Sequence, residues 1–144
     1  MLTEAEGVPV GLALDGANRH DMKMVEETIR SIPMPRPDPT AETPQHLCMD
    51  KGYDYEAVRG LVADFGYTAH IKARGEEAEA IKTEAGFKAR RWVVERTHGW
   101  LNRFRKILIR WERKVENYEA LLHLAFAFIV FAATERFWIH WIKN

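Results

Sequence analysis

The segment HLCMDKGYDYEAVRGLVADFGYTAHIKA, residues 46–73, predicts a strand, a helix and a second strand in succession. Its first residues, HLCMD (46–50), form a short apolar run that is typical of a buried strand. Asp54 stands at the N-cap position of the helical segment YEAVRGLVADF, and Gly66 is a typical residue for the end of that helix. Asp50 therefore lies at the carboxyl end of a strand, where open α/β sheets bind their ligands.

The residues before this unit add a further strand and a further helix to the prediction. VPVGLAL (8–14) has the apolar density of a strand. Asp21 occupies an N-cap position ahead of MKMVEETIRSI, in which the apolar residues from Met24 to Ile32 recur at helical spacing. The segment 33–44 holds five of the six prolines, so it is expected to be an exposed, extended connection.

The residues after the unit are expected to be mainly helical. A polar stretch at 74–86 predicts a loop or an exposed helix, and one long helix is expected from about Lys88 to Lys114. One side of that helix is apolar and another is polar. The apolar side comprises Val93, Trp100, Phe104, Ile107 and Trp111, and the polar side comprises Arg91, Glu95, His98 and Asn102. A final helix is expected at roughly 117–142.

This order of elements predicts an α/β fold with a mixed or parallel sheet, in one domain of 144 residues. The most apolar stretch, 120–133, is 14 residues long and is judged too short to span a bilayer, so a buried helix is expected there. The N-terminal MLTEAEG does not resemble a signal peptide. The single cysteine, Cys48, excludes a disulfide framework and predicts a reducing compartment.

The net charge of zero hides a strong asymmetry along the chain. Residues 1–87 contain 9 Lys and Arg against 16 Asp and Glu, whereas residues 88–114 contain 10 against 2. The second segment therefore carries a net charge of +8. Such a local field attracts the phosphate backbone of nucleic acids, and a solvated helix face is the alternative.

Two carboxylates are candidate metal ligands. Asp50 follows a predicted strand, and Glu95 lies on the basic helix. Two carboxylates held together can bind Mg²⁺, which prefers oxygen ligands, and a pair of such ions can support phosphodiester chemistry. The alternatives are structural: Asp50 starts the next turn, and Glu95 pairs with Arg91 one helical turn away.

Three segments resemble the second half of a DDE transposase, and the group they resemble most is the insertion-sequence five family of bacterial mobile elements. They are GVPVGLALDGANRHD, HLCMDKGYDYEAVRGLV and RRWVVERTHGWLNRFRKILIRWERKVENYEALLHLAFAFI. The resemblance covers Gly7 to about Phe131, and its most specific part is R-W-x-V-E-R-x-x-x-W-L-N-R-F-R. It implies an RNase H-like catalytic core in which three acids bind two Mg²⁺ ions, with Mn²⁺ as an alternative metal.

The resemblance assigns the second and third of these acids to Asp50 and Glu95, as catalytic residues and metal ligands. It also implies that Arg91 supports the glutamate or contacts phosphate. The chain departs from the related signature Y-(2)-R-(3)-E-(6)-K, because Lys88 occupies the Tyr position and Asn102 the Lys position.

The resemblance further implies that the first acid and the central first strand of the sheet precede Met1, so the RNase H-like core is expected to be incomplete. Asp15 and Asp21 do not match the motif position of that acid. The chain alone is therefore expected to be inactive, either as the downstream product of a frameshifted transposase or as the remnant of a decayed copy.

Three functions remain open. The first is DNA transposition by phosphodiester cleavage and strand transfer, with DNA-backbone contacts expected from Arg91, Arg96, Arg103, Arg105 and Lys106. The second is a non-catalytic fragment that binds DNA or a transposase as an inhibitor. The third is a stand-alone hydrolase in which Asp15 or Asp21 replaces the missing acid. The expected partners are double-stranded DNA, an upstream frame product or a second copy of the chain, and no membrane. The expected location is the bacterial cytoplasm, at the nucleoid.

Overall fold

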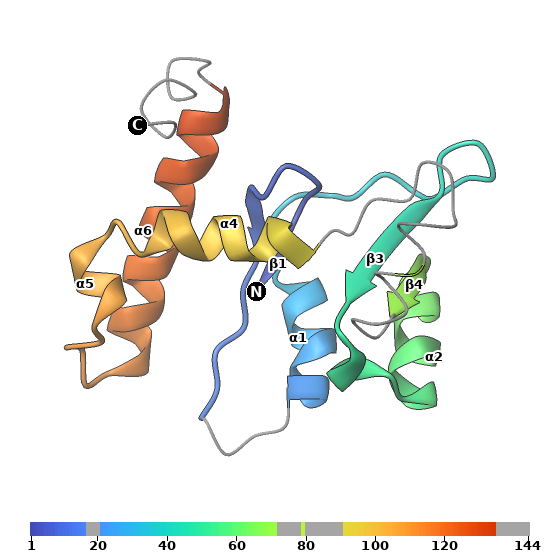
Figure 1. Cartoon of the computed structure of the whole chain (residues 1–144), viewed down its shortest axis with the longest axis horizontal. Coiled ribbons are helices and arrows are strands. Elements are labelled where there is room, and N and C mark those ends of the chain that lie inside the picture. Colours follow the sequence, from blue (N-terminus) through green and yellow to red (C-terminus); the bar gives the residue numbers. More distant parts are fainter. Residues whose placement is uncertain (17–20, 72–78, 80–90, 135–144) are drawn as a thin grey trace.

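The fold is a mixed α/β arrangement, as the sequence predicts. The computed structural model describes residues 1–16, 21–71, 79 and 91–134, apart from the side chains of residues 21, 22 and 91. Its elements are β1 (Leu2–Thr3), β2 (Pro9–Gly11), the short 3-10 helix η1 (Asp21–Met24), α1 (Val25–Arg30), β3 (Gln45–Met49), the 3-10 helix η2 (Lys51–Tyr53), α2 (Glu56–Asp64), β4 (Tyr67–Ile71), α4 (Arg91–Leu101), α5 (Arg105–Leu108) and α6 (Val115–Thr134). Figure 1 shows α4, α5 and α6 at one end of the molecule and β3, β4 and α2 at the other, with β1 and α1 between them.

The predicted strand–helix–strand unit is confirmed. β3 and β4 pair in parallel, with Gln45 opposite Tyr67 and Met49 opposite Ile71, and α2 connects them. Gly66 ends the helix with a φ of +77°, a conformation that glycine adopts without steric cost. The strands are only half-buried, because alternate residues point to solvent, so the expectation of a fully buried strand is wrong.

The described strands form two small sheets, one parallel and one antiparallel. β1 and β2 form a separate antiparallel hairpin, in which Leu2 lies opposite Gly11. Its turn is held by the side chain of Glu4, whose carboxylate accepts the backbone N–H groups of Glu6 and Val8 at 2.8 Å each. The strand expected at 8–14 is therefore shorter than predicted, and its partner β1 was not predicted because two residues carry no periodic signal.

The two small sheets share one hydrophobic cluster. Its buried members come from α1, β3 and α2, and Leu2 of β1 packs against them. They are Val25, Ile29, Leu47, Val58 and Val62. Both sheets therefore contribute to the same apolar cluster, even though no strand in the described part of the chain joins them.

The first helix begins later than predicted. Asp21 opens η1, and α1 follows with Met24 at its N-cap and no side-chain hydrogen bond there. The prediction of Asp21 as the N-cap is therefore wrong. The 3-10 turn displaces the helix start by one turn, while Val25 and Ile29 are buried as their spacing predicts.

The proline-rich connection 33–44 is exposed and contains no helix or strand, which confirms its prediction. It is nevertheless attached to the unit behind it. The Arg36 guanidinium lies 3.9 Å from the centroid of the Tyr67 ring and donates to the Phe65 carbonyl, and the Gln45 side chain donates to the Pro37 carbonyl at 2.6 Å.

The prediction of one long helix to Lys114 is wrong, because the helix ends at Leu101. Short-range hydrogen bonds close its end: Arg103 N–H donates to Trp100 and Phe104 N–H donates to Leu101. The chain turns there, and the short helix α5 follows with Phe104 at its N-cap. Beyond this turn, Phe104 and Ile107 pack against the core cluster to which α6 contributes. The expected segments at 74–86 and 88–90 lie outside the described residues, apart from Glu79.

A second core cluster joins α6 to α4 and to the hairpin end. Its buried members are Leu12, Leu101, Leu122, Ala125, Phe126 and Ile129. The sequence predicts that the apolar stretch 120–133 is too short to span a bilayer. This prediction is wrong, because the helix that contains it, α6, has 20 residues and is long and apolar enough to cross a membrane. Such a helix is weak evidence for a membrane span, since core helices of soluble proteins pass the same test. The predicted residues after 134 lie outside the described part.

Candidate functional site

Asp50 lies directly after β3 and is exposed, at the strand end where the sequence predicts a site. Its backbone is extended, and its carboxylate caps η2 by accepting the Gly52 N–H at 2.8 Å. We expected Asp54 to be the helix cap and Asp50 to be free, and this expectation is wrong. The 3-10 turn starts immediately after the strand, so its first N–H groups face the nearest carboxylate, which is Asp50.

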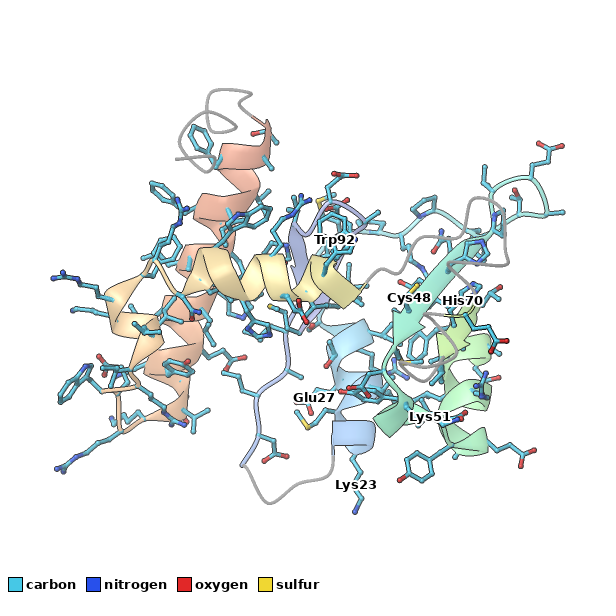
Figure 2. The ribbon with its side chains drawn as sticks, viewed as in Figure 1. Lys23, Glu27, Cys48, Lys51, His70 and Trp92 are labelled. Atoms are coloured by element: carbon cyan, nitrogen blue, oxygen red, sulfur yellow. The ribbon has the colours of Figure 1, made fainter. Side chains whose placement is uncertain are left out.

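Asp54 instead forms an ion-pair network with two cations. Its carboxylate lies 2.5 Å from the Lys51 Nζ and 2.7 Å from the Arg59 Nη2. Helix α2 begins two residues later, at Glu56, and its N-cap residue Tyr55 makes no side-chain capping bond. The hydrogen bond from Lys51, followed by that from Arg59, holds the pKa of Asp54 below its ordinary value of 3.8. Figure 2 shows Lys51 just beyond the end of β3.

Removing the lysine is expected to raise the pKa of Asp54 towards 3.8. The variant Lys51→Gln removes the larger contributor and leaves Arg59 in place. A folded-state pKa below the unfolded value stabilises the fold above that unfolded value, and this contribution is lost as the pH falls through the folded pKa. The carboxyl ¹³C chemical shift of Asp54 followed against pH measures the change, and Lys23→Gln is the control. An unchanged Asp54 titration in Lys51→Gln would contradict the network.

Glu95 is exposed on α4 and points away from the core. The opposite side of the helix carries Val93, Thr97 and Leu101, all of which are buried. The Thr97 hydroxyl attaches α4 to the hairpin, because it lies 2.5 Å from the Gly7 carbonyl oxygen and 3.1 Å from that of Val93. The position of Glu95 therefore depends on how α4 docks against the β1–β2 hairpin.

The structure does not assemble a complete metal site from the two candidate acids. Asp50 follows β3, which pairs with β4, whereas Glu95 lies on α4, which packs against β1. Among the residues that the structure describes, no group of three or more His, Cys, Asp or Glu side chains could hold a metal ion. The carboxylates have the right chemistry for a hard cation, but the described donor set does not by itself fit a two-metal centre.

The basic residues proposed to contact DNA occupy different environments. Arg96 is half-buried: its guanidinium lies 4.2 Å from the Trp92 ring centroid and 5.7 Å from that of Trp100, and it donates to the Glu6 carbonyl at 3.0 Å. Figure 2 labels Trp92 near the start of α4. Three other candidates, namely Arg103, Arg105 and Lys106, are exposed after α4. The side chain of Arg91 lies outside the described residues, so its predicted partnership with Glu95 remains a prediction.

Several residues of interest were not predicted. Trp111 was predicted on the apolar side of the long helix, but it lies in the connection after α5, where 77% of it is exposed. His46 and His70 lie on neighbouring strands, with 2.8 Å between Nδ1 of the first and Nε2 of the second. The parallel register places Cys48 opposite His70 on the same exposed face, as Figure 2 shows. Only the strand pairing, which the sequence leaves open, reveals the histidine contact.

The chain was compared with protein families, with curated proteins and with solved structures. A family model described as a transposase DDE domain matches residues 47–132. The chain is also 34% identical, over 138 residues, to a protein of Burkholderia cepacia described as a transposase for the insertion sequence element IS402. That alignment covers 94% of the chain and 63% of the relative, so the chain spans less than two thirds of the relative's length. No solved structure matches the chain.

Proposed function

The chain belongs to the DDE transposase family, and from this premise we propose that it is the C-terminal catalytic part of a transposase of the insertion-sequence five group. The complete enzyme hydrolyses a phosphodiester at the ends of a bacterial mobile element and uses the freed 3′-hydroxyl to attack target DNA. The observation that carries this proposal is the family match over residues 47–132, because it includes both Asp50 and Glu95.

We propose that the two small sheets are parts of one RNase H-like sheet in a single catalytic domain covering residues 1–144. Two observations support this. The helices α1 and α2 pack into one cluster with Leu47 of β3 and with Leu2 of β1. In the described part of the chain, β1 pairs only with β2 and β3 only with β4, so each has an edge that can accept a further strand. A central strand from a segment outside these residues would join the two edges.

We propose Asp50 and Glu95 as catalytic residues and as two of the acids that hold the divalent metal of the complete enzyme. DDE transposases generally use divalent metals, and Mg²⁺, with Mn²⁺ as the alternative, is the ion that two carboxylates select. Both residues are exposed, and each lies at the edge of its element: one at a strand exit and the other on the outer side of α4. The remaining acid would come from the joining strand.

The proposed partners are the double-stranded DNA of the element ends and of the target, together with an upstream part of the transposase or a second copy. Backbone contacts are proposed for Arg91, Arg96, Arg103, Arg105 and Lys106, which belong to the segment of charge +8. For Arg96 this role would add to its stacking between two tryptophans. The proposed location is the bacterial cytoplasm, at the nucleoid.

A second candidate function is a non-catalytic fragment that binds DNA or a transposase and inhibits transposition. The observation that favours it is the absence of an assembled acidic cluster among the described residues. This function needs the basic segment but neither candidate acid. The two functions therefore differ in cleavage and agree in DNA binding.

Binding of the chain to duplex DNA is expected to weaken steeply with salt, because each neutralised phosphate contributes a slope of about −0.9 in log K against log salt. The double variant Arg105→Gln/Lys106→Gln should reduce the magnitude of this slope by about 2. Lys23→Gln is the matched control, since Lys23 is exposed and lies in the acidic part of the chain, in η1 just before α1 (Figure 2). Fluorescence anisotropy with a labelled duplex measures the slope. A slope that the double variant leaves unchanged would remove both residues from the DNA interface.

A further inference from the structure

The connection between α5 and α6 exposes a large aromatic ring. This Trp111 loop, residues 109–114, has Trp111 near its middle, and 77% of that residue is exposed. Leu108, the last residue of α5, and Ile109, the first residue of the loop, are each 56% exposed. Apolar side chains in such a group on a folded domain mark a surface that binds something else.

Hydrogen bonds and ring contacts fix the backbone on both sides of the tryptophan. Arg110 Nε donates to the Glu112 carbonyl at 3.1 Å, and its guanidinium lies 5.2 Å from the Tyr118 ring centroid. The Glu112 carboxylate faces the Asn117 amide at 3.5 Å, and the Tyr118 hydroxyl donates to the Ile107 carbonyl at 3.4 Å. The segment that carries Trp111 is therefore held by contacts on both sides, which reduces the backbone entropy lost when the ring binds a partner.

The charge around the ring is strongly positive. Residues 103–114 contain six basic residues and one acid, a net charge of +5. The basic residues are Arg103, Arg105, Lys106, Arg110, Arg113 and Lys114, and all are exposed. A partner that fits must carry dense negative charge and must also offer a flat apolar face. Unstacked nucleobases on a phosphate backbone have both properties.

We infer that the Trp111 loop is a stacking platform for an unpaired nucleobase, with the surrounding cations on the flanking phosphates. The inference rests on the proposed function, because it takes DNA as the substrate, and it adds that part of this DNA is single-stranded or opened. Trp111 contacts the base, and Arg113 and Lys114 follow it directly on the chain.

An anionic membrane is the competing partner, since a tryptophan with basic neighbours also occurs at membrane interfaces. The packing of α6 argues against it. Leu122, Ala125, Phe126 and Ile129 of this helix are buried against Leu12 and Leu101. The helix could not span a bilayer without breaking that core. Its outer face, with Leu124, Phe128 and Phe131, is exposed, so binding to vesicles is one of the outcomes of the test.

The test measures the affinity of the 144-residue chain for a labelled oligo-dT by fluorescence anisotropy, over a series of salt concentrations. The oligo-dT has about 20 nucleotides, a length that covers one binding site. Trp111→Leu is expected to weaken binding about tenfold at every salt concentration, which is the scale of losing one stacked base. Its salt slope should stay unchanged, because no phosphate contact is removed. Trp111→Phe should recover most of the affinity, because it keeps an aromatic face. Leu124→Ala, which trims an exposed apolar side chain of α6, is the control and should bind as the unmodified chain does.

Three results would overturn the inference. Equal oligo-dT affinity for Trp111→Leu and the unmodified chain, with salt-dependent duplex binding intact, would refute the stacking role and leave the proposed function standing. Absence of binding to both single-stranded and duplex DNA would count against both. Trp111-dependent co-sedimentation with phosphatidylserine vesicles, without oligo-dT binding, would make the loop a membrane contact instead.

Discussion

Glu95→Gln, placed in a complete transposase that contains these residues, is expected to lower Mg²⁺-dependent DNA cleavage about a thousandfold or more, the scale of removing one member of a catalytic group. The fold should survive, because Glu95 is exposed on the side of α4 opposite to the buried Val93, Thr97 and Leu101. Glutamine has the same shape as glutamate and lacks only the charge that a cation needs. The measurement is strand cleavage of an end-containing DNA, with circular dichroism as a check on folding.

The partner variant at Asp50 separates chemistry from folding. Asparagine also caps helices, so Asp50→Asn should keep the hydrogen bond from Gly52 while removing the charge. Its cleavage should fall as far as that of Glu95→Gln, with stability unchanged. Asp50→Ala removes the cap as well and should cost about 1 kcal/mol of unfolding free energy in addition. If Asp50 only caps the turn, Asp50→Asn will cleave normally and the catalytic assignment will be wrong.

A matched control for the acids is Glu27→Gln. Glu27 is an exposed carboxylate on α1, as Figure 2 shows, and its replacement changes the net charge by the same amount. It should cleave as the unmodified enzyme does. Cleavage retained in Glu95→Gln would show that the assignment of Glu95 as a catalytic acid is wrong.

The part of the fold that the sequence predicts well is the part in which local signals agree. In the β3–α2–β4 unit, the apolar runs, the helical spacing of Val58 and Val62, and Gly66 all indicate the same boundaries. The strand exit at Asp50 was predicted for the same reason. The choice of Asp50 over Asp54 as the cap was missed, because both fit the N-cap pattern and only the immediate start of η2 decides between them.

The parts that the sequence missed depend on contacts between distant residues. The helix break after Leu101 places Phe104 and Ile107 against α6, and helical periodicity alone continues through this turn. Trp111 was placed on the apolar side of the long helix for the same reason, because its phase belongs to a helix that the chain does not form. The two sheets could not be foreseen either, since strand pairing is set by packing and not by the strand pattern.

The docking of α4 is the feature on which the placement of Glu95 depends, and a buried hydroxyl contributes to it beside the Arg96 hydrogen bond to the Glu6 carbonyl. Thr97 is completely buried, and its Oγ1 lies 2.5 Å from the carbonyl oxygen of Gly7. Gly7 is itself buried in the hairpin turn with a φ of +87°, and a Cβ atom there would lie 3.3 Å from Oγ1 of Thr97. Helix and turn are therefore in close contact, and the hydroxyl satisfies a carbonyl that water cannot reach.

Thr97→Val is expected to lower the unfolding free energy by about 1–3 kcal/mol, the cost of leaving a buried carbonyl without its donor. Valine fills the same volume, so the loss reports the hydrogen bond and not a cavity. Urea denaturation measures it, and Thr68→Val is the control, because Thr68 is exposed on β4 and its change should stay within about 0.5 kcal/mol. Thr97→Ser keeps the hydroxyl and should recover part of the loss. Equal stability of Thr97→Val and the unmodified chain would show that the hydroxyl does not hold the helix. If Thr97 does hold α4 against the hairpin, Thr97→Val should also reduce DNA cleavage by the complete enzyme, because α4 positions Glu95.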